Sequence, residues 1–213
     1  MRGAALAVII TVFPLSAAAD GGLSPEAVGS VVRSERWNVR RKPHKVEELS
    51  GNVTYDKDNR HLRADWALYD HKTKVLQGRG GIRITQETTK GRKIHLTGER
   101  GSYDDNSRQG VLSGQTDADP VRFKRVDAAG QDIGGAQCRT VHWDAAQEAV
   151  SLEGRRPYLR ADEPGWSGAV QADRITAHRG TDTGRRIVAE GRTSGWLYFP
   201  HDTDRAVKAA PQP

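Results

Sequence analysis

The sequence predicts an all-β protein built from stacked antiparallel hairpins, with much of its sheet facing solvent. Two observations carry this prediction: apolar side chains alternate with polar ones, and a hairpin-sized segment recurs along the chain. The composition agrees with it. Apolar residues make up 36% of the 213 residues, and another 23 residues are glycine, which has no side chain to pack in a core. Such a chain can bury a core, but a thin one.

The alternation locates the strands. A spacing of two residues between apolar side chains is typical of a strand with one buried face. The clearest case is residues 62–70, with apolar side chains at Leu62, Ala64, Trp66 and Leu68. The same spacing occurs at Ile82/Ile84, Ile94/Leu96, Val121/Phe123 and Trp196/Tyr198.

One hairpin unit is repeated. Residues 62–70 (LRADWALYD) align with residues 96–104 (LTGERGSYD), and weaker copies begin at Trp143 and Ala172. Each copy continues into a polar turn and a return strand that ends in Gly, which suits a bend or bulge. Aligning Val-Leu with Val-Leu in the return strands makes the second turn two residues longer than the first. The Tyr-Asp pair is expected to be a turn device, with Asp as the cap.

The N-terminus predicts export. Residues 1–19 contain one Arg, an apolar run and a small-residue cleavage site, as in a signal peptide. The apolar run is shorter than the roughly 20 residues of a spanning helix and contains Pro14. We therefore expect a cleaved signal peptide and a periplasmic protein.

The rest of the chain divides into three parts. Residues 20–45 form an N-terminal segment, in which Ser24-Pro25-Glu26 offers the start of one short helix. The sheet is expected over residues 46–200. Residues 201–213, which end in AAPQP, are expected to be disordered.

No catalytic motif is visible. The seven His residues show no metal-ligand spacing, and one Cys cannot form a disulfide framework. Cys138 is expected to be a small buried hydrophobe. The segment 165–168 (GWSG) lacks the glycine spacing of a nucleophile elbow. We therefore expect no enzyme activity, no metal and no cofactor.

The basic clusters have two interpretations: solvated turns and strand exteriors, or a surface that binds an anionic partner. The formal net charge is +6, but export and the lack of a stacking aromatic platform argue against nucleic acid. Guanidinium groups bind phosphates in a bidentate manner. An anionic lipid or glycolipid of the cell envelope therefore fits better.

Three phrases resemble a known family. LSGNV at residues 49–53, LxADxAxYD at 62–70 and GxGGI at 78–82 resemble the OstA-like lipopolysaccharide-transport family. That family includes LptA, LptC and the N-terminal domain of LptD. The resemblance is clearest over residues 46–114 and extends to Phe199. It implies a β-jellyroll, or β-taco, that is open along one edge.

The resemblance also implies a function. An LptA-like protein is a periplasmic carrier or bridge that shields the lipid A acyl chains of lipopolysaccharide in an apolar β-groove, between the inner and outer membranes. Its partners would be lipopolysaccharide, other Lpt jellyroll proteins paired through edge strands, and a second copy of the chain. Two alternatives are an LptC-like component tethered to the inner membrane at the lipopolysaccharide ABC exporter, and an exported β-solenoid for glycan binding or adhesion.

The apolar face of the alternating strands then becomes the predicted lipid-binding groove. A shift of one residue in register would move every side chain to the other face. The other interpretation of the same residues is the ordinary core of a closed sandwich. The predicted groove residues are Leu62, Ala64, Trp66, Leu68, Ile82, Ile84, Ile94, Leu96 and Phe123.

Overall fold

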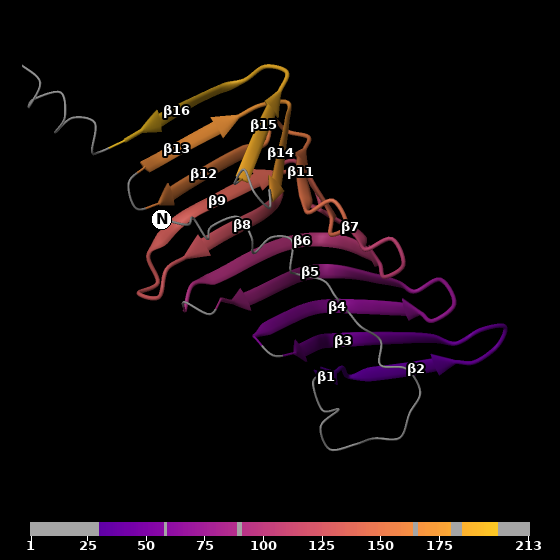
Figure 1. Ribbon diagram of the computed structural model, residues 1–213. Helices are drawn as coiled ribbons and strands as arrows, with labels where there is room; N and C mark the ends of the chain where they lie inside the picture. Colours follow the sequence, from indigo (N-terminus) through magenta and orange to yellow (C-terminus); the bar gives the residue numbers. More distant parts are fainter. Residues whose placement is uncertain (1–29, 58, 89–90, 164–165, 180–184, 200–213) are drawn as a thin grey trace, which may run out of the picture.

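The computed structural model describes residues 30–57, 59–88, 91–163, 166–179 and 185–199. The predicted signal peptide, the helix start at Ser24 and the predicted tail lie outside these residues. Over the described residues, sixteen strands form one antiparallel sheet (Figure 1), so the predicted all-β fold of stacked hairpins is confirmed. No helix in this part of the chain is long and apolar enough to cross a membrane.

The sheet begins at Ser30, before the expected boundary at residue 46. The first eight strands are β1 (Ser30–Arg33), β2 (Arg36–Arg40), β3 (Val46–Lys57), β4 (Arg60–Asp70), β5 (Val75–Glu87), β6 (Lys93–Asp104), β7 (Gln109–Ser113) and β8 (Val121–Val126). The other eight are β9 (Asp132–Cys138), β10 (Thr140–Asp144), β11 (Ala149–Glu153), β12 (Tyr158–Glu163), β13 (Trp166–Gln171), β14 (Arg174–Arg179), β15 (Arg185–Glu190) and β16 (Ser194–Tyr198).

The long strands β3 to β6 each run through two layers. Residues 93–97 of β6 pair with β8, whereas residues 100–104 pair with β7. In the same way, one half of β3 pairs with β1 and the other half with β2. The first layer continues through β8, β9, β12, β13 and β16, and the second through β7, β10, β11, β14 and β15 (Figure 1).

Bulges fold the two layers toward each other. The pairing register shifts between Ser50 and Val53 in β3, and the neighbouring ladders shift at the same level of β4 and β5. The bulged strands hold successive residues with positive φ: Gly51 (76°) and Asn52 (45°) in β3, and Gly80 (80°) and Gly81 (54°) in β5. Bulges bend a strand and increase its twist. The inner faces of the two layers therefore face each other across a crease.

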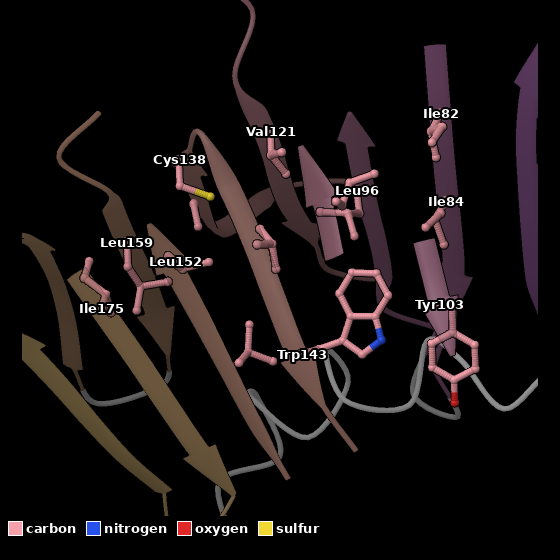
Figure 2. Close-up of a cluster of buried hydrophobic side chains, with 14 of the residues drawn as sticks. Ile82, Ile84, Leu96, Tyr103, Val121, Cys138, Trp143, Leu152, Leu159 and Ile175 are labelled. Atoms are coloured by element: carbon pink, nitrogen blue, oxygen red, sulfur yellow. The ribbon is translucent and has the colours of Figure 1, made fainter. Parts of the chain in front are cut away.

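The main core lies between the layers. Its buried side chains come from both of them, such as Leu96 and Val121 from the first layer and Leu152 and Ile175 from the second (Figure 2). A separate small cluster of Leu49, Val53 and Ala67, with Val32 packed against it, lies in the N-terminal part of the sheet. The interior is therefore divided into two packed regions.

The predicted Asx caps are confirmed at both Tyr-Asp pairs. Asp70 Oδ1 accepts a hydrogen bond from the Lys72 amide at 2.8 Å, and Asp104 Oδ1 accepts one from the Asn106 amide at the same distance. Asp144 caps the turn of the third copy in the same way. These hydrogen bonds lower the pKa of Asp104 and Asp144, although burial acts in the other direction.

The turns of the first two copies have the same length, so the expected two-residue difference is wrong. Val75 pairs with Asp70, and Gln109 occupies the equivalent position opposite Asp104. The return strand of the second copy starts at Gln109, and the residue equivalent to Leu112 in the first copy is Gly78. The matching Val-Leu pairs therefore lie at different positions in the two hairpins.

Candidate apolar groove

A cavity of about 420 Å³ lies between the two layers. Strands β1 to β7 and β10 provide its walls, so it occupies the N-terminal part of the sheet. Its size falls within the range of roughly 300–1,000 Å³ that is common for ligand pockets. Its walls include members of both packed regions, such as Val53 from the small cluster and Ile84 from the main core.

Four of the predicted groove residues line this cavity. Leu62 and Ala64 come from β4, and Ile82 and Ile84 come from β5. Leu62 pairs directly with Ile84 across the two strands, so their side chains lie on the same face. Together they form an aliphatic wall on the first layer. Leu49, Ala67 and Leu76 form much of the facing wall on the second layer.

Trp66 and Leu68, which the sequence also predicts in the groove, do not line this cavity. The β4–β5 register shifts between Arg63 and Trp66, and beyond this shift Ala67 and Tyr69 face the cavity. Successive side chains of a strand point to opposite faces. Trp66 and Leu68 therefore lie on the outer face of β4.

Trp66 makes two polar contacts on the outer face of the sheet. The Arg79 guanidinium lies 4.2 Å from the centre of its ring, in a cation–π contact. Its indole Nε1–H donates a hydrogen bond of 2.8 Å to Glu48 Oε1. On the outer face, both the ring and the indole N–H of Trp66 therefore have a partner.

The other three predicted residues lie outside this cavity. Leu96 is buried in the main core, and Phe123 is half-buried against it. Ile94 is also buried, on the same strand as Leu96. The structure therefore brings these side chains into packed parts of the first layer rather than to the cavity wall.

The second-layer wall contains aromatic residues that the sequence reasoning missed. Tyr69, Tyr103 and Trp143 occupy the same position in three copies of the repeat, and all three line the cavity. The Tyr-Asp pair therefore has two roles: its Asp caps the turn and its Tyr faces the interior. The recurrence of an aromatic residue at one position of the repeat could have identified these wall residues from the sequence.

A polar cluster forms part of the cavity rim. Glu47 Oε1 accepts hydrogen bonds from Lys45 Nζ at 2.9 Å and from His71 Nε2 at 2.8 Å. Burial acts to raise the pKa of Glu47, but these two partners outweigh it and hold this pKa below its usual value of 4.5. The carboxylate is therefore ionised and paired at neutral pH.

Tyr69 extends this cluster. Its hydroxyl donates a hydrogen bond of 3.3 Å to Asp105 Oδ2, and its ring makes an edge contact with the imidazole of His71. Burial, together with the negative charge of Asp105, raises the pKa of Tyr69 to about 12. The hydroxyl therefore stays protonated, and the rim offers paired polar groups beside an apolar interior.

The cavity has mainly apolar walls, with paired polar groups at its rim. In the part of the chain that the structure describes, no three His, Cys, Asp or Glu side chains gather closely enough to hold a metal ion. Cys138 is buried away from the cavity, and this burial raises the pKa of its thiol to about 12. The fold and the cavity thus define an all-β protein with an internal apolar groove.

Comparison with known proteins reveals a likeness of fold. One solved structure with a similar fold is that of LptH, the LptA homologous periplasmic component of the conserved lipopolysaccharide transport device from Pseudomonas aeruginosa. The TM-score is 0.47 and the sequence identity 19%, over 64% of this chain and 93% of that chain. No family model and no curated protein matches the sequence.

Proposed function

We propose that this chain is a periplasmic carrier or bridge for lipopolysaccharide, which holds lipid A acyl chains in the groove between the two layers during transport from the inner to the outer membrane. The observation that carries the proposal is the cavity itself, with aliphatic walls such as Leu62 and Ile84 on one layer and Leu49 and Ala67 on the other. The sequence phrases shared with the OstA-like family support the choice of lipid.

The energetics favour an alkyl ligand. Protein interiors are close-packed, with few voids larger than a water molecule. An apolar cavity of about 420 Å³ therefore has side-chain atoms that lack packing partners. Burying a dozen methylene groups contributes roughly 10 kcal/mol before the costs of binding, at about 0.8 kcal/mol for each. This is enough to keep an acyl chain out of water.

The ends of the sheet support the proposed assembly. Strand β16 pairs with β13 alone among the described strands, so its other edge carries unpaired backbone groups. Its side chains are unusually apolar for an exposed strand: Leu197 is 69% exposed, and Trp196 and Tyr198 are also exposed. Such an edge suits pairing with another jellyroll protein or with a second copy of the chain.

Lipid content tests the carrier function. The protein is purified from envelope extracts, and its bound lipids are identified by mass spectrometry in the Leu62→Asp and Arg63→Asp variants. Leu62 lines the cavity, whereas the neighbouring Arg63 is exposed. We expect an acylated glycolipid on the unmodified protein and on Arg63→Asp, and little on a folded Leu62→Asp. Absence of lipid from every form, with no binding of added lipopolysaccharide, would exclude the carrier function.

The choice of an LptA-like bridge over an LptC-like tethered component depends on the predicted cleavage of residues 1–19. N-terminal sequencing of the protein recovered from cells tests it. A mature chain that begins near Asp20 in the periplasmic fraction supports the bridge. A chain that keeps Met1 and fractionates with the inner membrane favours the tethered component.

A further inference from the structure

The groove ends at Trp143. The strands that line it in the described chain are β1 to β7 and β10, and Trp143 is the contribution of β10. The strands that follow in either layer provide no wall of this cavity. The groove therefore extends from the N-terminal strands of the sheet as far as the indole of Trp143.

The indole is held across the interior by its neighbours. It stacks on the ring of Tyr103, with ring centres 6.4 Å apart and planes 15° from parallel (Figure 2). Trp143 pairs across the strands with Gly110, and a Cβ at this glycine would overlap the indole. The indole of Trp143 therefore occupies the space that a side chain at position 110 would need. Trp143 is only 6% exposed.

Beyond Trp143 the side chains between the layers include several that are deeply buried. Val150 and Leu152 on β11 are buried in the main core, and Ile175 on β14 is fully buried. The first layer contributes Ala136 and Leu159 to the same cluster. An alkyl chain that reached this region would have to displace packed side chains.

The repeat explains why Trp143 is the last aromatic residue at this position. Tyr69, Tyr103 and Trp143 hold equivalent positions, and the next equivalent residue is Ala177, which is next to Val150 in the β11–β14 ladder. The fourth copy thus has a methyl group where the third has an indole. Trp143 is the last large ring of this series.

We infer that Trp143 sets the length of alkyl chain that the groove accepts. This inference rests on the proposed function, because it assigns a chain-length limit to the same groove. The indole acts as the end wall, held in place by Tyr103 and by the space over Gly110. Chains that stop short of the ring fit the cavity, and longer chains leave their terminal methylenes outside it.

The limit is tested by measuring the affinity of saturated fatty acids of increasing length. Each is bound to the purified full chain and to its Trp143→Ala variant. For the unmodified protein, affinity should increase about fourfold for each added methylene up to a limit, and then level off. In Trp143→Ala the limit should move to longer chains by about two methylenes or more. Trp66→Ala is the matched control, because that ring lies on the outer face.

The outcomes separate the inference from the function it rests on. An unchanged limit in folded Trp143→Ala would overturn the inference while leaving the carrier function intact. If no fatty acid of any length binds either protein, the proposed function fails, and the length limit with it. Should Trp143→Ala not fold in a thermal-unfolding assay, Trp143→Leu replaces it, with a smaller shift expected in the same direction.

Discussion

The carboxylate of Asp65 fills the space beside Gly80. A Cβ added to this glycine would lie 2.5 Å from Asp65 Oδ2, and Gly80 has a φ of 80°. The adjacent Gly81 also has a positive φ, of 54°, but a Cβ there would meet nothing within 4 Å. Both glycines at the crease of β5 have a positive φ, but only at Gly80 does a neighbouring side chain occupy the space that a Cβ would need.

Alanine at these two positions should therefore have unequal effects. Both substitutions place a Cβ at positive φ, which costs about 1 kcal/mol. Gly80→Ala must also displace Asp65, so we expect it to lose about 3 kcal/mol in the free energy of unfolding. Denaturant unfolding of the two variants measures the difference. Equal losses at the two positions would show that Asp65 does not restrict Gly80.

The strands could be predicted from the sequence because their determinants are local. Alternating side chains at residues 62–64 and 82–84 identify strands and also give the correct inner face. The Asp caps of the turns follow from the preference of Asp for hydrogen bonding to amides two or three residues ahead. Both features need only short-range information.

The second half of β4 could not be predicted in the same way. Leu62, Ala64, Trp66 and Leu68 form an unbroken alternation, yet the first pair faces the cavity and the second pair does not. The register shift depends on the bulge around Gly80-Gly81 in the next strand, and a slip of one position inverts every later side chain. The bend is therefore a property of paired strands rather than of the β4 sequence.

The pairing at Glu47 predicts a component of acid sensitivity. Burial raises the pKa of this carboxyl, but the hydrogen bonds from Lys45 and His71 hold it below 4.5, which is close to its value in the unfolded chain. Its stabilising contribution is therefore fully present above 4.5 and is lost as pH falls through the folded pKa. Glu47→Gln removes this contribution.

We therefore expect the unmodified protein to lose more stability than Glu47→Gln between roughly pH 5 and pH 3. Urea unfolding at several pH values measures both curves, and the other titrating groups act equally in the two proteins. Parallel curves would contradict a role for Glu47 in the acid response.

The thiol of Cys138 should be unreactive in the folded protein. Burial raises its pKa to about 12, so almost no thiolate is present at pH 8, and the side chain is only 2% exposed. We expect no reaction with a water-soluble thiol reagent under native conditions and rapid labelling in guanidinium chloride. Rapid labelling of the native protein would show that the β9 region opens readily.

Photocrosslinking in cells would show whether the cavity between the layers carries lipid. A photoreactive residue is placed in turn at Leu62 and Ala67, which line the cavity, and at Arg63 and Leu68, the next residues along the same strand. We expect adducts of lipopolysaccharide size at Leu62 and Ala67 and none at the other two positions. Adducts at Leu68 without any at Ala67, or none at any position in a folded periplasmic protein, would contradict it.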